Sequence, residues 1–490
     1  MKCYLAVDLG AESGRAILGT LNGNQLQLEE LHRFPNVPVR TPSGLYWDSL
    51  RLFHEIQQGL SVAGRERKIG LDGVGVDTWG VDFALLGRDG SLVANPMHYR
   101  DSRNDGMLDK TFAVVPREEI FAHTGIQFIQ LNTLCQLYAM KLAGAPGLEA
   151  AARLLFMPDL FNYWLTGVAR NELTEASTSQ FYNPIEKRWA TELFERLGLS
   201  ASILGEIVFP GTLLGPLLPH VAEAAGLERV PVFATASHDT AAAVAAVPAE
   251  GKGWCYISSG TWSLMGVELP EPVINERSLA LNFTNEIGFG GTVRFLKNIA
   301  GLWLLQECRR AWALEGNEFG YDDLARLAAS SQPFKAIISP DAFLYPGAMP
   351  AQIAAWCGSR GQVAPETPGE FTRTILESLA LRYRQVLESL ESAISRQIGP
   401  IHIVGGGSRN RLLNQLVADA TQRLVVAGPS EATAAGNVMV QAIGSGVIAD
   451  LKEARAVVRR SLPLSLYEPQ PSGGWDDAYS RFSNLDAGRS

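Results

Sequence analysis

The sequence has few cysteines and no long apolar run, and both absences restrict what the protein can be. The cysteines are odd in number, scattered and without C-x-x-C spacing, which favours reduced buried thiols over a disulfide framework or a zinc site: Cys3, Cys135, Cys255, Cys308 and Cys357. The short apolar run after Met1 ends at Asp8 and is too brief for a signal peptide. No run approaches the roughly 18–20 residues that span a bilayer. We therefore expect a cytoplasmic protein without a membrane partner.

Clusters of basic residues are also missing. The chain carries 42 Lys and Arg residues against 51 Asp and Glu, a net charge of −9, so no nucleic-acid partner is expected. With 490 residues, 46% of them hydrophobic, the chain can form two large domains. The Pro- and Gly-rich stretch Pro248–Gly253 predicts the boundary, which divides the chain into residues 1–247 and 248–490.

The stretch ATASHDTAAAVAAV (234–247) places one carboxylate, Asp239, between a short apolar segment and an alanine-rich run. The first part predicts a buried strand and the second a helix, so Asp239 lies at a helix N-terminus. Such a carboxylate can be a helix cap, or it can be the reactive group to which the rest of the chain brings reactants. We expect the helix N-terminus to lower its pKa.

Three glycine-bearing turns are of the kind that binds phosphate. The first lies in CYLAVDLGAESGRAILGT (3–20), a predicted strand, turn and strand that a third strand follows. Asp8, Ser13, Gly14 and Arg15 supply a carboxylate, a hydroxyl, a bare backbone and a cation, although a plain hairpin is an alternative and Glu12 would repel a phosphate. The second turn follows a strand at Ser258–Thr261, and the third, Gly405–Gly407, lies between a strand and a helix.

Other segments suit a sugar. The segment DTWGVDF (77–83) puts Trp79 and Gly80 between two carboxylates, a composition that fits a polyol, with a hairpin that buries its Trp as the alternative. The loop HYRDSR (98–103) could face the same site or be solvated. Asn298 is predicted to cap a following helix. Residues 48–63 and 371–394 have helical spacing, and residues 112–209 are read as mostly helical without catalytic chemistry.

In this order over nearly the whole chain, the motifs DLGAESGR, GVDTWGVDF, SHDTA, SSGTWSLMG, LKNIAGLWLLQ and HIVGGGSRN resemble the FGGY family of carbohydrate kinases. The resemblance implies an α/β fold of two actin-like (ribonuclease H-like) ATPase domains, with nucleotide and sugar in a cleft between them. Residues 1–247 would form the N-terminal sugar-kinase domain and residues 248–490 the C-terminal nucleotide-binding domain.

Where the motifs match, the resemblance implies roles for individual residues of this sequence. The resemblance implies that Asp239 is the catalytic base and that Asp8 lies near a Mg²⁺ ion. The residues implied to contact ATP are Ala11, Glu12, Ser13, Gly14, Arg15, Thr261, Gln306 and Gly406. Those implied to contact the ketose are Gly80, His238, Asp239, Thr240 and Asn298. One departure is that many family members have hydroxyl residues where Ala11 and Glu12 stand.

The activity that the resemblance implies is transfer of the γ-phosphoryl group of ATP to the 1-hydroxyl of L-rhamnulose, in L-rhamnose catabolism. A kinase for another ketose, L-fuculose or xylulose, is an alternative, as is a non-sugar actin-like ATPase. The missing G-x-G-x-x-G spacing disfavours a dinucleotide-dependent dehydrogenase. The sequence predicts no oligomeric state.

Overall fold

The computed structural model describes residues 1–344, 347–471 and 473–486, and the chain forms two compact units. Unit 1 comprises Met1–Pro248, Glu268–Phe295 and Ala432–Leu462. Unit 2 comprises Ala249–Val267, Leu296–Glu431 and the chain from Pro463 onward. Each unit therefore has segments that are far apart in sequence, and the domain boundary after Val247 stays a prediction.

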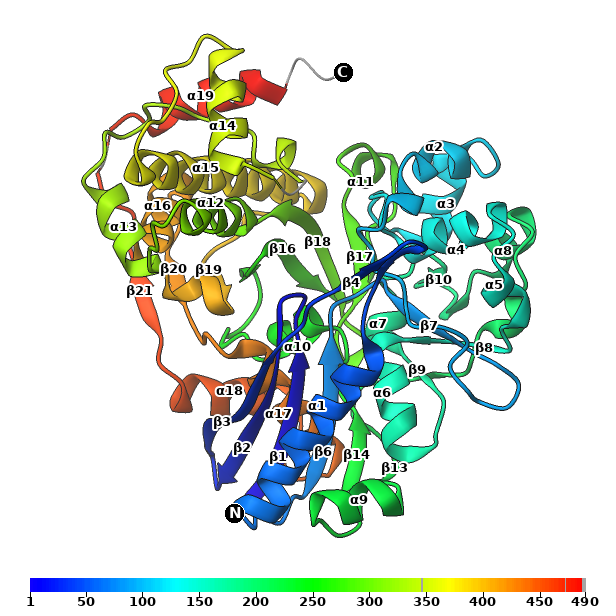
Figure 1. The fold of residues 1–490 in the computed structure, drawn as a ribbon. Helices are drawn as coiled ribbons and strands as arrows, with labels where there is room; N and C mark the ends of the chain where they lie inside the picture. Colours follow the sequence, from blue (N-terminus) through cyan, green and yellow to red (C-terminus); the bar gives the residue numbers. More distant parts are fainter. Residues whose placement is uncertain (345–346, 472, 487–490) are drawn as a thin grey trace. The chain divides into compact units, whose positions relative to one another are not determined.

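Unit 1 is built on a six-stranded sheet in the order β13-β14-β6-β1-β2-β3 (Figure 1). The strands are β1 (Lys2–Leu9), β2 (Ser13–Asn22), β3 (Gln25–Pro35), β6 (Gly73–Thr78), β13 (Thr212–Pro216) and β14 (Pro231–Ala234). The first three form the predicted antiparallel meander, while β6 is parallel to both β1 and β14. In this register Asp8 lies opposite Arg15 on β2 and Asp77 on β6.

Helices cover both faces of this sheet. Successive side chains of a strand point to opposite faces, and those of β1 are buried on both. One face packs on α1 (Ser49–Ser61), α6 (Met157–Thr166) and α9 (Pro219–Ala225) through an apolar cluster. The other face packs on α17 (Ala432–Gly444), where Tyr4 Oη and Ser445 Oγ lie 2.6 Å apart. Asp8 is four residues after Tyr4 on β1, so both side chains point to the same face of the sheet, the one that packs on α17.

The predicted alanine-rich helix is α10 (Asp239–Ala245), which packs against α17. The contact is close because both helices present small residues: an added Cβ at Gly436 would lie 1.8 Å from the Ala242 carbonyl oxygen. Glycine therefore lets α17 support the element that begins with Asp239.

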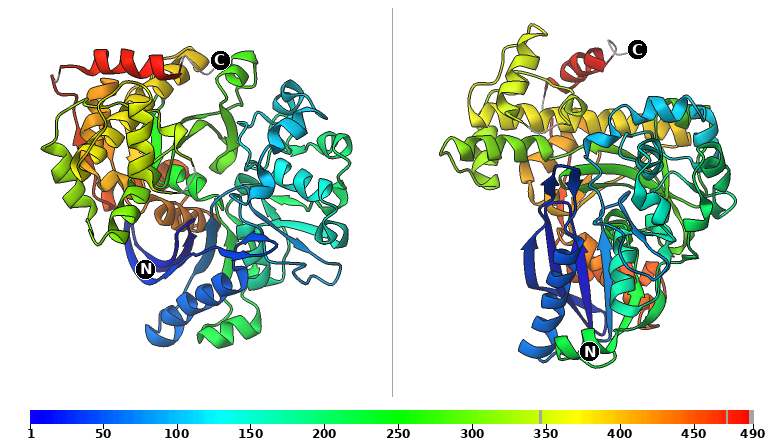
Figure 2. Two further views of the ribbon diagram at one scale, coloured as in Figure 1. Left: turned by 45° about the horizontal axis from the view of Figure 1, so that its top comes forward. Right: turned by 45° about the vertical axis from the view of Figure 1, so that its right-hand side comes forward.

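A second group of helices in unit 1, coloured cyan to green, is visible in Figures 1 and 2. It has its own apolar core. Its helices are α2 (Met107–Phe112), α3 (Arg117–Thr124), α4 (Thr133–Leu142), α5 (Pro146–Ala150), α7 (Leu173–Ala176) and α8 (Thr191–Arg196). Short strands accompany them: β8 (Arg153–Phe156), β9 (Asn171–Glu172), β10 (Tyr182–Asn183), β11 (Arg188–Trp189) and β12 (Ile207–Val208).

The alternative of a hairpin at residues 77–83 is wrong. The strand β6 belongs to the main sheet of unit 1, whereas β7 (Phe83–Leu86) pairs with β8. Residues 77–83 consequently lie between two different sheets. The remaining elements of unit 1 include β4 (Val39–Thr41), β5 (Gly44–Tyr46), α11 (Glu276–Ala280), β17 (Thr284–Ile287) and α18 (Leu451–Ser461).

Unit 2 contains strands in the order β16-β15-β19-β20-β21, and helices surround them. The strands are β15 (Cys255–Ser259), β16 (Trp262–Leu269), β19 (Ile401–Val404), β20 (Val425–Ala427) and β21 (Ser465–Tyr467). The boundary between the units falls within β16 and within β18 (Val293–Ala300). The helices are α12 (Trp303–Leu314), α13 (Tyr321–Ala329), α14 (Met349–Gly358), α15 (Pro368–Ile394), α16 (Arg411–Thr421) and α19 (Trp475–Asp486).

The long helix predicted for residues 371–394 is α15, drawn in yellow in Figures 1 and 2. Its start is fixed by a capping box, in which Thr367 and Glu370 bond each other's backbone N–H groups, and by Pro368 in the first turn. The strand predicted before the turn at Ser258–Thr261 is also confirmed, as β15, which pairs antiparallel with β16.

All five cysteine side chains are buried, as the sequence suggested. Within the described parts of the chain, no helix combines the length and the apolar character needed to cross a membrane.

Candidate active site

Asp239 is the first residue of α10, and backbone pairing with β6 fixes its approach. The Thr78 N–H donates to the Ser237 carbonyl at 2.8 Å, and Thr78 and His238 form a parallel bridge. The Thr240 hydroxyl donates to Asp239 Oδ1 at 3.0 Å. The Asp239 side chain is 31% exposed, so one part of it is held by the protein and another part can meet a ligand.

The pKa of Asp239 is raised to about 7, contrary to the expectation that a helix N-terminus would lower it. Burial is the main cause, and the negative charge of Asp8 is the second. Hydrogen bonds from Thr240 and the charge of Arg294 act in the opposite direction. The effect of a seven-residue helix is therefore smaller than the cost of ionising a carboxylate in this place.

The first predicted phosphate turn joins β1 to β2. It is tight, with the Gly10 N–H donating to the Ser13 carbonyl at 2.9 Å. Asn36 binds it twice, through its backbone N–H to the Glu12 carbonyl and its side-chain Nδ2 to the Gly10 carbonyl, both at 2.9 Å. The Glu12 side chain is exposed. Asn36 thus binds the turn through two of its carbonyl groups.

Carboxylates gather at the end of β1. Arg15 forms an ion pair with Asp8, and Asp77 on the neighbouring strand accepts a hydrogen bond from Asn437 Nδ2 at 2.5 Å. Burial, together with the charge of Asp8, raises the pKa of Asp77 well above its usual value. Asp77 Oδ1 is buried without a hydrogen-bond partner. Over the described residues, no three His, Cys, Asp or Glu side chains lie close enough together to hold a metal by themselves.

Gly80 and His238 lie side by side. An added Cβ at Gly80 would be 3.3 Å from His238 Nε2 and 3.3 Å from the Thr178 side chain. The His238 side chain is only 8% exposed. Unit 1 therefore brings together Asp8, Gly80, His238, Asp239 and Thr240, and it places the turn Ala11–Arg15 directly after Asp8.

Asp82, in the segment that suits a polyol, is a structural residue. Its Oδ2 accepts hydrogen bonds from the indole N–H groups of Trp47 (2.6 Å) and Trp79 (3.1 Å), and its Oδ1 accepts one from Gln136 (2.9 Å). The Trp47 ring also stacks on His98, which is buried. These contacts favour the alternative in which Trp79 belongs to the core, and they show that the loop after residue 97 is not simply solvated.

The predicted nucleotide residues of unit 2 surround the turn between β15 and β16. The Thr261 carbonyl accepts the Trp303 N–H at 3.1 Å, which joins this turn to the start of α12. Gln306, on the same helix, has its Oε1 buried without a hydrogen-bond partner. The triple-glycine turn packs on the end of β15, since an added Cβ at Gly407 would lie 2.0 Å from Ser259 Oγ, and Gly406 is exposed.

Asn298 does not cap a helix, which corrects that prediction. It lies within β18, and the N-cap of α12 is Leu302. The helix predicted after Asn298 is confirmed as α12, but Asn298 itself belongs to the strand before it.

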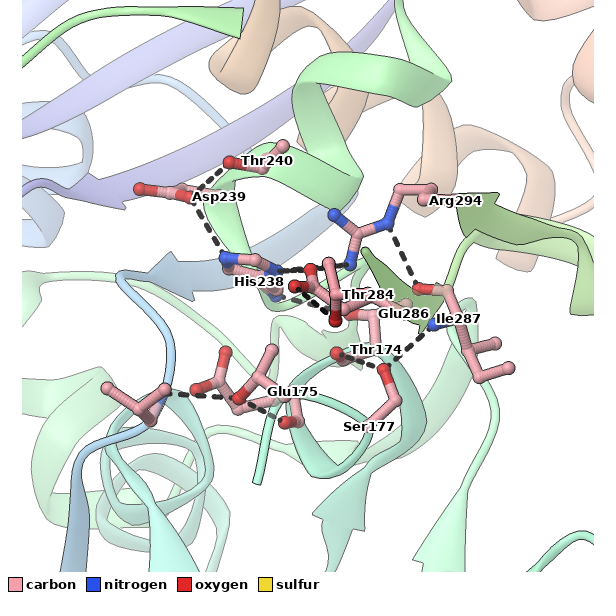
Figure 3. Close-up of polar contacts among 12 residues, drawn as sticks. Thr174, Glu175, Ser177, His238, Asp239, Thr240, Thr284, Glu286, Ile287 and Arg294 are labelled. Carbon is pink, nitrogen blue, oxygen red and sulfur yellow. Dashed lines mark hydrogen bonds and ion pairs between the residues drawn. The ribbon is translucent and has the colours of Figure 1, made fainter. Parts of the chain in front are cut away.

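Sequence reasoning missed the residues that hold the segment before Asp239. The Glu172 carboxylate accepts the Ser237 N–H at 3.1 Å, and the Thr174 hydroxyl accepts the His238 N–H at 3.2 Å. Both lie in the region that we read as free of catalytic chemistry. Glu286 and Arg294 also contact His238, as Figure 3 shows. The only signal for Arg294 was a charge between the apolar residues Val293 and Phe295.

Comparisons with known proteins give matches over nearly the whole chain. The N-terminal domain model of the FGGY family of carbohydrate kinases matches residues 3–246, and the C-terminal domain model matches residues 255–445. The chain is 47% identical to a rhamnulokinase of Bacteroides thetaiotaomicron, over 98% of this chain and 99% of that protein. It is 40% identical to a rhamnulokinase of Oceanobacillus iheyensis, over 95% and 98%. The crystal structure of a xylulose kinase from Lactobacillus acidophilus superposes with a TM-score of 0.81 at 14% identity, covering 100% of this chain and 98% of that one, and shows the shared fold.

Proposed function

The chain belongs to the FGGY family of carbohydrate kinases, and we propose that it transfers the γ-phosphoryl group of ATP to the 1-hydroxyl of L-rhamnulose. The products would be L-rhamnulose 1-phosphate and ADP, in the catabolism of L-rhamnose. The sugar is suggested by the names of the curated relatives that span nearly the whole chain. The observation that carries the chemistry is Asp239, a part-exposed carboxylate with a pKa of about 7 beside His238.

Asp239 is proposed to accept the proton of the attacking hydroxyl. As the hydroxyl oxygen forms its bond to the γ-phosphorus, the bond from phosphorus to the bridging oxygen of ADP breaks and the proton passes to the carboxylate. The transition state of phosphoryl transfer is largely dissociative, so the proton leaves late and alignment matters more than base strength. A pKa near the operating pH suits a group that must accept a proton and release it again.

The ketose is proposed to contact Gly80, His238, Asp239, Thr240 and Asn298. The absence of a side chain at Gly80 keeps open the space beside His238 Nε2, because an added Cβ would lie 3.3 Å from that nitrogen. The imidazole of His238 supplies a hydrogen-bonding group at that place, and Thr240 holds Asp239 through its hydroxyl.

ATP is proposed to bind through Ala11, Glu12, Ser13, Gly14, Arg15, Thr261, Gln306 and Gly406. Asn36 donates hydrogen bonds to two carbonyl groups of the first turn. This favours an orientation of the turn in which its backbone N–H groups face an anion. A nucleotide hydroxyl or amine would satisfy the buried Oε1 of Gln306, which has no hydrogen-bond partner. Gly406 is exposed and an added Cβ would meet nothing within 4 Å, so a flat group can approach its backbone.

Mg²⁺ fits the carboxylates at the end of β1. This ion usually binds one or two protein carboxylates, several waters and the phosphates of its substrate, so a site without three protein ligands is no obstacle. Asp8 would hold it, and the buried Asp77 Oδ1 without a partner would lie nearby as a further acceptor. The ion would neutralise the charge of the phosphates.

The proposal is tested with a panel of ketoses. ADP release is measured with L-rhamnulose, L-fuculose and xylulose, and the product is identified by ³¹P and ¹H NMR. We expect the largest kcat/KM for L-rhamnulose, with phosphate on the 1-hydroxyl. A larger value for either of the other two sugars would assign the enzyme to that sugar instead. Turnover that rises with unfolded peptide and with none of the sugars would contradict a sugar kinase altogether.

The role of Asp239 is tested by Asp239→Asn. Loss of a general base typically lowers kcat by about 10²–10⁴-fold, and we expect a fall in that range with little change in sugar binding. Asp89→Asn is the matched control, because Asp89 only stabilises a surface turn through Ser91. Near-normal turnover of Asp239→Asn would show that another group accepts the proton.

A further inference from the structure

Arg294 is a fully buried cation next to the proposed sugar site. Its side chain has 0% exposure, although it lies on β18 among apolar residues. The guanidinium Nε donates to the Ile287 carbonyl at 3.2 Å, and Nη2 lies 3.1 Å from both His238 Nδ1 and Glu286 Oε2. Figure 3 shows His238 between this guanidinium and Asp239. A buried charge with such specific partners indicates a role beyond packing.

The contact with Arg294 decides which nitrogen of His238 carries the proton. A guanidinium can only donate hydrogen bonds, so His238 Nδ1, at 3.1 Å from Nη2, must accept. Burial and the positive charge of Arg294 hold the pKa of His238 well below its usual value, so the ring is neutral. A neutral imidazole has one N–H, which must then be on Nε2.

The other charged groups around His238 are acidic. Asp239 Oδ1, at the start of α10, lies 3.5 Å from Nε2, and Glu286 Oε2, on β17, lies 3.5 Å from Nδ1. Glu175, on α7, interacts electrostatically with both carboxyl groups. A carboxylate beside Nδ1 would by itself favour a proton there. Arg294 Nη2 lies closer to Nδ1 than the Glu286 carboxylate does, and it also forms an ion pair with that carboxylate. Arg294 therefore removes the preference for a proton on Nδ1.

We propose that Arg294 is a positioning residue that fixes His238 as the Nε2–H tautomer, so that His238 presents an N–H donor to a ketose oxygen beside Asp239. This inference rests on the proposed function, because it takes His238 as a contact of the sugar. A donor at Nε2 next to an acceptor at Asp239 can orient a polyol, since one oxygen is fixed by the N–H while the reacting hydroxyl turns its proton to the carboxylate. Gly80 leaves the room for that oxygen.

The first test reads the tautomer directly in the full-length protein. Two-bond ¹H–¹⁵N NMR spectra of ¹⁵N-histidine-labelled enzyme are recorded without ligand between pH 6 and 8, and His238→Gln identifies the His238 signals. We expect Nε2 protonated and Nδ1 unprotonated throughout this range. A proton on Nδ1, or a doubly protonated ring at pH 7, would overturn the inference. This measurement does not depend on phosphoryl transfer, so its failure is distinct from a failure of the proposed function.

The second test combines substitution with kinetics. In Arg294→Gln we expect loss of the pure Nε2–H signal and a rise in KM for L-rhamnulose of roughly 3–10-fold, the range of one hydrogen bond between neutral groups. The KM for ATP should stay within about twofold, a free-energy change below 1 kcal/mol. Arg294→Lys keeps a cationic donor and should restore part of the tautomer signal and of the sugar KM.

A matched control and a second variant keep the test decisive. Arg373→Gln also removes a part-buried arginine that binds a glutamate and a backbone carbonyl, but within unit 2, and it should leave both the His238 signals and the sugar KM unchanged. Should Arg294→Gln fail to fold, Glu286→Gln takes its place, and the Nε2–H tautomer should persist there because Arg294 still donates to Nδ1. A switch of the proton to Nδ1 in Glu286→Gln, or unchanged tautomer and sugar KM in a folded Arg294→Gln, would refute the role of Arg294.

Discussion

Replacing Gly436 by alanine should displace the helix that begins with Asp239. An added Cβ at Gly436 on α17 would lie 1.8 Å from the carbonyl oxygen and 2.5 Å from the carbonyl carbon of Ala242 on α10. Both atoms belong to the backbone, so no side-chain rotation relieves the clash. An ordinary contact begins near 3.4 Å, so the two helices must separate by about 1.6 Å at this point.

The size of the effect follows from this displacement. Overpacking of a close-packed interior costs about 1–3 kcal/mol, and a backbone clash belongs at the upper end. For a domain of about 300 residues such as unit 1, a loss of about 3 kcal/mol lowers Tm by roughly 5 °C. Misplacing a catalytic group by about 1 Å can cost about 10²-fold in rate. We therefore expect a lower Tm and a kcat reduced about 100-fold, even though residue 436 contacts no substrate.

The assay compares Gly436→Ala with Gly358→Ala by thermal unfolding and by coupled ADP release. Gly358 is the last residue of α14, and an added Cβ there would meet no atom within 4 Å. This control should be neutral or more stable by up to about 1 kcal/mol, because alanine favours a helix over glycine. If Gly436→Ala has the Tm and kcat of the wild type, the close packing of α10 on α17 does not position Asp239, and the reasoning fails.

Two further predictions concern the same site. Gly80→Ala should raise the KM for the ketose by about tenfold, roughly 1.4 kcal/mol, because the new methyl group lies 3.3 Å from His238 Nε2. Gly70→Ala is the control and should leave this KM unchanged, because its methyl group meets nothing within 4 Å. Steady-state kinetics of both variants measures the difference. Burial raises the pKa of Glu172 to about 7 in the folded protein from 4.5, so between these values the folded state holds a proton that the unfolded state has lost. Stability should therefore fall as pH rises from 4.5 to 7, by up to about 3 kcal/mol relative to Glu172→Gln. Urea unfolding of both proteins at pH 5 and pH 8 checks this, and a stability difference that does not change with pH would contradict it.

Local signals in the sequence predicted much of the fold. The meander at the start of the chain alternates between apolar and turn residues, and β1 to β3 follow it closely. The alanine-rich run after Asp239 and the amphipathic run of α15 are helices whose ends are set by nearby residues. Such elements depend on neighbours within a few positions, so a single sequence contains the information that specifies them.

The partners of the site could not be predicted in the same way. Nothing local shows that residues 77–83 connect two sheets, and only the tertiary fold decides that β6 joins the main sheet and β7 pairs with β8. Asn298 looked like a cap because nothing local shows how far β18 extends. Glu172 looks like an exposed glutamate in a polar stretch, yet it is fully buried and bonds the backbone at Ser237, 65 positions away.

Several buried acidic groups lie near Asp239. Burial raises the pKa of Glu175 well above its usual value, with further contributions from Asp159, Glu172, Asp239 and Glu286, and both its carboxyl oxygens are buried without hydrogen-bond partners. Well-packed apolar residues in place of buried charged groups are often neutral or stabilising, so stability alone does not account for so many acids in one place. Three of the acids lie directly at this segment, since Glu172 accepts the Ser237 N–H and both Asp239 and Glu286 lie beside His238. A proton on Glu175 keeps a second negative charge away from Asp239, with which it interacts, while burial and the charge of Asp8 hold the pKa of Asp239 at about 7, the value that suits a proton acceptor at neutral pH.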